Sequence, residues 1–320
     1  MKKKKLNPQK LNNETYELIK KVKKVVLSSI YNDDELARYL TLKGGTLLDM
    51  VWKVTGRPSV DIDFSIDTTL SDALDNPDEF GDRLKKALKQ GFSEGIDGVQ
   101  YSVLDFKLEL RPPEISDDLK HFWGGYMASF SIIETSKQTT PEEDKKRALF
   151  IGKSKVRNGE TLLSPKFSID ISLHEICREN RKEAEFGDVF IEIYTPLMVV
   201  YEKLRAICQT DPRYNSIIKR SRDSKPRTKD FYDIYVIMKL LDIDIKENFS
   251  LLQEIFSIKK VPLEFLEGVK DKEDFHSGNF ETVLSTLPED EVKHKTFKPY
   301  FDFVIDLIEK EILPNIEDTE

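Results

Sequence analysis

The spacing of apolar residues along the chain changes from a helical period to a strand period and back again. Residues 13–30 carry apolar side chains at helical spacing, with Asn or Thr available as the N-cap. From Ser59 to Asp67 apolar and polar residues alternate, which predicts a strand. We also expect a helix over 77–90, ended by Gly91, and strands in 101–110, 124–133 and 166–175. The first half of the chain therefore mixes helices and strands.

The strand pattern stops at Thr195-Pro196, which reads as an N-cap followed by a proline in the first helical turn. Amphipathic helices are predicted in 227–241, 249–256 and 297–313. This order predicts an α+β fold with a mixed sheet and flanking helices, followed by an all-α C-terminal domain. We place a flexible basic N-terminus at 1–12, the α+β domain at 13–195 and the helical domain at 196–320, where it contributes to the active site.

Composition narrows the function classes. The net charge of −8 does not suit a protein that coats nucleic acid through global positive charge. Two basic segments, 2–5 and 213–229, are able to meet phosphates locally. A solvated tail is the favoured interpretation of the first, and a flexible linker explains the second equally well. The only cysteines, Cys177 and Cys208, lack metal-site spacing and are expected to be free buried thiols.

No uninterrupted apolar run approaches the ~20 residues of a membrane-spanning helix. The lysines at 2–5 are followed by polar residues and not by the apolar region of a signal peptide. We therefore expect a cytoplasmic protein without membrane contact.

The alternating strand carries two acids that share one face. Asp61 and Asp63 lie two residues apart, so their side chains point the same way while Ile62 and Phe64 enter the core. A divalent cation relieves the repulsion between such carboxylates, and Mg²⁺ is typically held by one or two carboxylates together with substrate phosphates. The alternative is a solvent-facing strand with incidental acids.

A glycine turn precedes this strand. Gly44-Gly45-Thr46 stands at the start of a predicted helix that turns Leu47 and Leu48 inward. Backbone N–H groups and the helix dipole attract phosphate at such a position. Neither GxxxxGK[ST] nor GxGxxG occurs, which excludes the common nucleotide-binding loops. The order strand, Gly-Gly, helix and acid-bearing strand predicts a phosphate site beside a metal site.

These segments resemble the AbiEii/AbiGii-type nucleotidyltransferase toxins of the DNA polymerase β-like superfamily, which belong to type IV toxin–antitoxin systems. LKGGTLL, then Arg57, then 59–64 (SVDIDF) is similar to the first motif of the family. EKLRA at 202–206 and RTKDFYD at 227–233 are similar to its two later motifs. The resemblance implies the α/β nucleotidyltransferase fold.

The resemblance also implies roles for individual residues. Asp61 and Asp63 would bind Mg²⁺ or Mn²⁺, and a third carboxylate would come from Asp170, with Asp105 as its rival. The expected nucleotide-phosphate contacts and the residues that complete the site are Gly44, Gly45, Thr46, Ser59, Lys203 and Asp230.

The chain itself leaves alternatives for the last two residues. Lys203 would neutralise triphosphate charge, but a solvated lysine paired with Glu202 fits the same position. Asp230 falls in the first turn of a helix, where dipole stabilisation alone favours an acid, and Asp233 is the second choice.

The activity implied by the resemblance is transfer of a nucleoside monophosphate from an NTP to the 3′ end of an RNA, especially tRNA, by a growth-inhibiting toxin. Such a toxin would have a cognate antitoxin that acts without a stable complex. Two alternatives stay open: nucleotidylation of a protein hydroxyl, and a nucleotide-binding regulator without catalysis. Phe122, Trp123 and Tyr126 offer a base-stacking platform, against which ordinary core packing must be weighed.

Overall fold

The computed structural model describes residues 9–71, 76–157, 160–288 and 292–317. Its centre is a seven-stranded mixed sheet in the order β4-β5-β8-β3-β2-β10-β9. The strand pairs β3–β8 and β2–β10 are parallel and the other neighbours are antiparallel. The strands of this sheet are β2 (Thr41–Lys43), β3 (Ile62–Asp67), β4 (Tyr101–Arg111), β5 (Gly125–Glu134), β8 (Phe167–Glu175), β9 (Lys182–Phe186) and β10 (Val189–Ile193).

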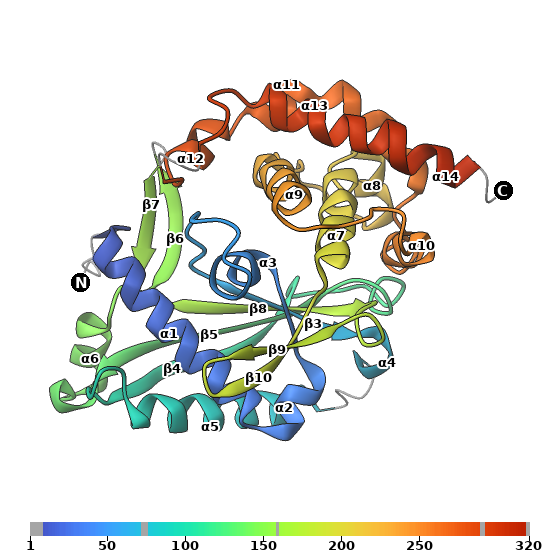
Figure 1. Ribbon diagram of the computed structural model, residues 1–320. Coiled ribbons are helices and arrows are strands. Elements are labelled where there is room, and N and C mark those ends of the chain that lie inside the picture. Colours follow the sequence, from blue (N-terminus) through green and yellow to red (C-terminus); the bar gives the residue numbers. More distant parts are fainter. Residues whose placement is uncertain (1–8, 72–75, 158–159, 289–291, 318–320) are drawn as a thin grey trace.

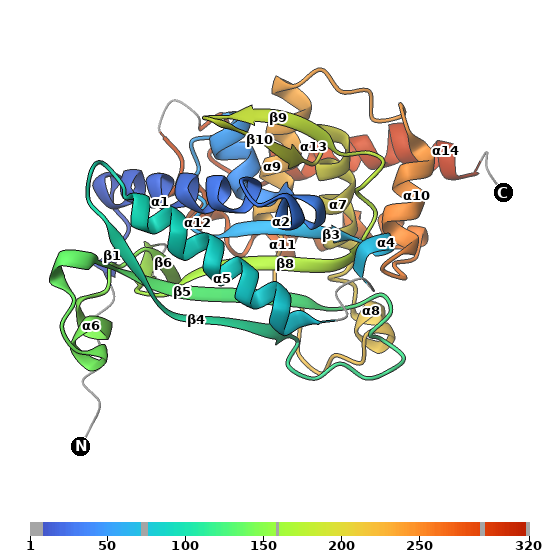
Figure 2. The ribbon, with the colours of Figure 1, turned by 90° about the horizontal axis from the view of Figure 1, so that it is seen from below.

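Helices of the N-terminal half cover one face of the sheet, where α1 (Asn13–Tyr31) and α5 (Pro77–Glu94) lie side by side (Figure 2). The Asn12 side chain caps α1 by accepting the Thr15 N–H at 2.8 Å. The prediction that Gly91 ends α5 is wrong, because the helix continues to Glu94 and Gly95 is its C-cap, with φ +100°. Gly91 instead makes room for Ser29 of α1, which a Cβ at this position would meet.

The acid-bearing strand is shorter than the alternating pattern predicts. Strand β3 begins at Ile62, and Ser59, Val60 and Asp61 precede it. The Asp61 carbonyl accepts a hydrogen bond from the Thr46 hydroxyl at 2.8 Å, so a side chain replaces the sheet partner there. Ile62 and Phe64 are fully buried, as the alternation predicts.

The glycine turn leads into a shorter helix than expected. Element α3 (Gly44–Thr46) passes directly into a π-helical turn, η1 (Leu47–Val51). Leu47 and Leu48 are buried as predicted, whereas Trp52 is only partly buried. The turn packs against β3, which brings the glycines next to the acids.

Every named element after β10 is helical in the part of the chain that the structure describes, and these helices lie on the face opposite α1 and α5 (Figures 1 and 2). Thr195 caps α7 by accepting the Met198 N–H at 3.3 Å, as predicted. Core residues of both halves form one hydrophobic cluster, so the boundary at 196 stays a prediction. The elements are α7 (Pro196–Cys208), α8 (Pro212–Ile217), α9 (Thr228–Leu240), α10 (Phe249–Ser257), η3 (Leu263–Lys272), α11 (Glu273–Ser277), α12 (Phe280–Leu284), α13 (Lys298–Leu307), η5 (Ile308–Ile312) and α14 (Leu313–Glu317).

A second, three-stranded sheet was not predicted. It has the order β1-β7-β6, with β1 (Gln9–Lys10), β7 (Glu160–Ser164) and β6 (Gly152–Arg157). Of the predicted flexible N-terminus, 1–8 lie outside the described residues, while Gln9–Lys10 pair with β7. The remaining short helices are α2 (Asp34–Tyr39), α4 (Thr68–Ser71), η2 (Thr135–Lys137) and α6 (Pro141–Arg147).

The helices and the cysteines allow two further sequence predictions to be examined. Within the described segments, none of the helices combines the length and the apolar character that crossing a bilayer requires. Cys177 and Cys208 are buried free thiols, as predicted.

Candidate functional site

A cavity of about 680 Å³ lies between the sheet and the C-terminal helices. Its floor comes from β2, β3 and β8, and its opposite wall from α7 and α9. It brings together residues that are far apart in sequence, and the first motif and both later motifs contribute to it. The predicted site residues in its lining are Gly44, Gly45, Ser59, Asp61, Asp63, Asp170, Lys203 and Asp230.

Three carboxylates meet at one end of this cavity, which we call the acid end (Asp61, Asp63 and Asp170). Asp63 and Asp170 are register partners on the parallel strands β3 and β8, and Asp61 lies two residues before Asp63. Asp105 does not line the cavity and instead pairs with Lys145 at 3.1 Å. Of the two candidates for a third carboxylate, the structure places Asp170 beside the pair.

The acids repel one another. Burial, followed by the charges of Asp61 and Asp170, raises the pKa of Asp63 to about 7. Burial and Asp61 also raise the pKa of Asp170. Burial opposes ionisation of Asp61 as well, but Lys153 and other positive groups outweigh it and lower its pKa. The acid end therefore holds more negative charge than its surroundings readily stabilise.

Such a donor set fits a divalent cation. Hard oxygen ligands are what Mg²⁺ prefers, and a cation would remove the repulsion that raises the pKa of Asp63. Among the described residues, no three His, Cys, Asp or Glu side chains converge closely enough to enclose a metal ion. A metal at the acid end would therefore complete its shell with substrate phosphate and water, as Mg²⁺ commonly does.

The glycine turn lies so close to the acid-bearing segment that side chains at its two glycines would collide with that segment. Gly44 has φ +72°, and a Cβ on it would lie 2.8 Å from Cγ and 2.9 Å from Cβ of Asp63. A Cβ on Gly45 would lie 2.8 Å from the Ser59 hydroxyl oxygen. Both glycines thus lie directly against the acid-bearing segment, and Gly44 also has a backbone conformation that favours glycine.

Replacing Gly44 by alanine is therefore expected to cost more than the same change at Gly45. Alanine at 44 meets a positive φ and the inner atoms of Asp63, and we expect a loss of roughly 2–3 kcal/mol of stability. Alanine at 45 meets the Ser59 hydroxyl oxygen, which is able to rotate, and the Ser59 Cβ at 3.0 Å, without the added strain of a positive φ. Urea unfolding of both variants measures the difference, and equal midpoints would contradict this account of the turn.

Ser59 and Thr46 hold the acid segment. The Thr46 hydroxyl donates to the Asp61 carbonyl and does not line the cavity, and Ser59 donates to the Asp61 carboxylate at 3.3 Å. Beneath them the fully buried Lys23 donates to the Ser59 carbonyl. Sequence reasoning missed Lys23, although its position on the apolar stripe of α1, next to Val22, was a usable signal.

A second charged group joins the two halves of the chain. Lys203 of α7 contacts Asp230 at 2.9 Å and Asp233 at 2.8 Å, both on α9. Arg57 donates to both carboxylate oxygens of Asp233 at 3.0 Å. Burial alone lowers the pKa of Lys203, but the two acids outweigh it and raise the pKa, so Lys203 is a permanent cation. Glu202, the partner considered from the sequence, pairs instead with Lys43 and Arg205.

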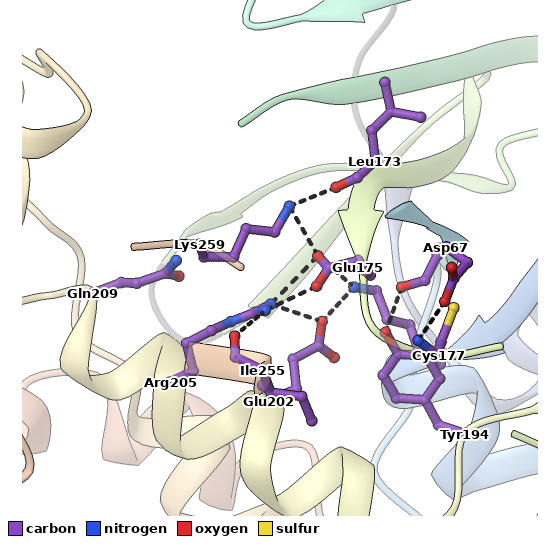
Figure 3. A network of polar contacts seen from close by, with 12 residues as sticks. Asp67, Leu173, Glu175, Cys177, Tyr194, Glu202, Arg205, Gln209, Ile255 and Lys259 are labelled. Carbon is purple, nitrogen blue, oxygen red and sulfur yellow. Dashed lines mark hydrogen bonds and ion pairs between the residues drawn. The ribbon is translucent and has the colours of Figure 1, made fainter. Parts of the chain in front are cut away.

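A third charged group, centred on Glu175, was not predicted from the sequence (Figure 3). Glu175 contacts Arg205 at 2.8 Å, Lys259 at 3.4 Å and Lys43 at 3.7 Å. Lys259 also donates to the Leu173 carbonyl at 2.5 Å. These four charged side chains are nearly inaccessible to solvent, are paired with one another, and line the cavity wall.

Other cations near the acid end are less fully paired. The Lys153 ammonium lies 3.9 Å from Asp61. Lys229 lines the cavity without an ion-pair partner among the described residues, and burial, Arg57 and Lys153 lower its pKa to about 8. Arg111 adds a third positive charge to the lining. This end therefore offers positive charge to an incoming anion.

The basic segment 213–229 contributes less than its charge suggests. Arg213 contacts Asp211 at 3.0 Å, Lys219 contacts Asp118 at 2.6 Å, and Arg220 donates to Asn215 at 2.8 Å. From this segment, Arg227 and Lys229 line the cavity. Arg213, Lys219 and Arg220 thus serve intramolecular contacts.

Comparison with known proteins identifies the family of the chain. No curated protein matches the chain. The family described as nucleotidyl transferase AbiEii toxin, type IV toxin–antitoxin system, matches residues 25–307, which include all three charged groups of the cavity. The family name indicates a nucleotidyl transferase with a cognate antitoxin. The chain belongs to the AbiEii nucleotidyl transferase toxin family.

Proposed function

We propose that this protein transfers a nucleoside monophosphate from an NTP to an acceptor hydroxyl, with Mg²⁺ or Mn²⁺ as cofactor and the 3′ end of a tRNA as acceptor. The observation that carries the proposal is the acid end, where Asp61, Asp63 and Asp170 share one cavity with Lys153, Lys229 and Arg111. Carboxylates suit a divalent cation, and nearby cations without closed ion pairs suit the phosphates that accompany it.

The transfer forms one bond and breaks another. The oxygen of the acceptor hydroxyl bonds to the α-phosphorus and loses its proton to water, the bond from that phosphorus to the bridging oxygen breaks, and pyrophosphate leaves. The bound cation would supply Lewis-acid stabilisation of the phosphate charge. Ser59 and Thr46 hold Asp61 in place, and Gly44 and Gly45 leave room for the acids.

The cations have distinct tasks in this proposal. Lys229 and Lys153 face the phosphates, because neither is enclosed in a closed ion-pair network. Lys203, held by Asp230 and Asp233, contributes a fixed positive charge to the cavity wall. Neutralisation of the leaving pyrophosphate is therefore shared between Lys229 and Lys153 and the fixed charge of Lys203.

In a type IV toxin–antitoxin system this reaction serves growth inhibition, and we propose that it does so by blocking tRNA ends. The antitoxin would act without a stable complex, and the protein would work in the cytoplasm. Arg227 and Lys229, at the border between segment 213–229 and the cavity, would guide an RNA backbone to the acid end.

The test is incubation of the purified protein with each of four α-labelled NTPs, Mg²⁺ and total bacterial RNA. We expect label in a tRNA-sized band, and we expect none with Asp63→Asn. Label in protein and not in RNA would replace the tRNA acceptor by a protein hydroxyl. Tight NTP binding without transfer to any acceptor would instead indicate a regulator without catalysis.

NTP affinity is expected to weaken as the pH rises through about 8, because Lys229 then loses its proton. Its pKa is lowered by burial, Arg57 and Lys153, with Asp233 and Asp61 opposing, so the cation is present below that pH and absent above it. Loss of one charge at the phosphates costs about 1 kcal/mol, roughly fivefold in affinity. Equilibrium binding on either side of this pH measures the effect.

Lys229→Arg is the matched control, since arginine stays charged throughout this range. The variant should bind NTP with a flatter pH profile than the wild type. An unchanged profile in the variant would show that another group titrates.

A further inference from the structure

The cavity continues beyond the acid end into a part with a different lining. The cavity follows β8 from Asp170 past Ser172 to Glu175, and successive residues of a strand are ~3.3 Å apart along its axis. Trp123, just before β5, and Tyr126, at its start, join the lining there, because Gly125 is the register partner of Ser172. We call this part the aromatic lobe; its residues are Trp123, Tyr126, Ser172, Glu175, Arg205 and Gln209.

The charges of the aromatic lobe are already neutralised. Glu175 and Arg205 contact each other at 2.8 Å, and Lys259 contacts Glu175 at 3.4 Å (Figure 3). An anion entering here would have to break buried ion pairs, whereas the acid end offers Lys229 without a partner among the described residues. What the lobe offers a ligand is therefore aromatic surface and neutral hydrogen-bonding groups.

The buried side chain of Tyr214 contacts both Trp123 and Gln209. Tyr214 is 1% exposed, and its hydroxyl donates to the Lys259 carbonyl at 2.6 Å. The Trp123 ring packs edge-on against Tyr214 with a centroid distance of 6.0 Å. The Gln209 amide nitrogen donates to the Tyr214 hydroxyl at 3.3 Å, and its oxygen bonds no described residue. Trp123 and Gln209 are thus positioned relative to each other before any ligand arrives.

We propose that the aromatic lobe is a nucleobase subsite, in which the base stacks on Trp123 and hydrogen-bonds to the Gln209 amide. A base is flat, aromatic and neutral, with donors and acceptors at its edge, and stacking on an aromatic side chain accepts every base. Tyr214 is a positioning residue for both contacts. The inference rests on the proposed function and adds where the base lies and which side chain reads its edge.

Tryptophan fluorescence reports on this subsite directly. The chain has two tryptophans, and the other, Trp52, does not line the cavity. In Trp52→Phe, titration with an NTP should quench the fluorescence of Trp123 in a saturable way. Total tRNA in a separate titration shows whether the base comes from the RNA acceptor. Quenching by either ligand supports the subsite and names its source.

Affinity measurements separate the base from the phosphates. Trp123→Ala and Gln209→Ala should each weaken binding of the quenching ligand by about tenfold, and Trp123→Phe should retain most of the affinity. Binding of inorganic triphosphate, which has no base, should be unchanged in both alanine variants. Tyr214→Phe keeps the ring and removes the hydroxyl, so it should raise KM for the NTP more than it lowers kcat.

The outcomes distinguish this inference from the proposed function. If the variants bind and transfer NTP like the wild type and neither ligand quenches Trp123, the subsite is overturned while nucleotide transfer stands. If wild-type protein binds neither NTP nor triphosphate by calorimetry, both proposals fail.

Discussion

Asp63→Asn is expected to abolish nucleotide transfer while making the folded protein more stable at alkaline pH. The carboxylate lies at the centre of the acid end, and loss of one such preorganised group lowers a reaction rate by roughly 10²–10³-fold. The stability gain follows from the pKa of Asp63, which burial and the two neighbouring acids raise to about 7 from 3.8. A shift of this size corresponds to a gain of about 4 kcal/mol at pH above 7.

The sign of this pH dependence is fixed by proton binding. Between the unfolded pKa of 3.8 and the folded pKa of about 7 the folded state holds the proton more tightly, so wild-type stability falls as the pH rises through this window. Asparagine has no such proton. Urea unfolding of the two proteins should therefore coincide below this window and diverge above it.

Asp105→Asn is the control for the site. Asp105 lies on β4 of the same sheet, but its partner is Lys145 and it does not line the cavity. It should retain transfer activity, and Asp170→Asn should lose it. Activity lost in Asp105→Asn and kept in Asp170→Asn would reverse our assignment of the third carboxylate.

Asp233→Asn is expected to destabilise the protein by about 3–5 kcal/mol, the cost of removing one partner from a buried ion pair. Asp233 is 1% exposed and neutralises both Arg57 and Lys203, which have little access to solvent. Without its charge, two buried cations lose a shared counter-charge. Chemical denaturation measures the loss.

Asp230→Asn is the matched comparison, because it neutralises the neighbouring acid of the same helix. Asp230 and Asp233 both contact Lys203. The other cation near Asp230 is Arg227, which lies 3.7 Å from its carboxylate and is exposed to solvent. We expect a stability loss of about 1 kcal/mol and a large loss of transfer. Equal destabilisation by the two substitutions would contradict the structural role that we give to Asp233.

Local sequence pattern predicts the elements of this fold well where the signals are strong. The cap and proline at Thr195-Pro196 begin α7, and the alternation around Phe64 identifies the central strand. Pattern reasoning misses β6 and β7, whose sequences (GKSKVR and ETLLS) do not alternate clearly. The predicted helix end at Gly91 is wrong for a related reason. A glycine that leaves room for Ser29 of a neighbouring helix looks the same in the sequence as a glycine that ends a helix.

The site shows the same limit more sharply. Asp61 and Asp63 are identified by their spacing, but Asp105 and Asp170 occupy similar strand sequences. Asp170 is the register partner of Asp63, whereas Asp105 lies at an irregularity in the pairing of β4 with β5 and has φ +50°. Pairing of β8 with β3 is a contact between distant segments. Lys43, Glu175 and Lys259 were missed because charged residues are normally exposed, and their burial depends on partners far along the chain.

The joining of the two halves through Arg57 and Asp233 has a consequence for synthesis on the ribosome. The acids of β3 are made early, whereas Lys203, Asp230 and Lys259 emerge only much later. A nascent or prematurely terminated chain that ends before α9 carries the acids without the wall that faces them. We therefore expect such fragments to be harmless to the cell that makes them, so that toxicity begins only when translation has passed the C-terminal helices.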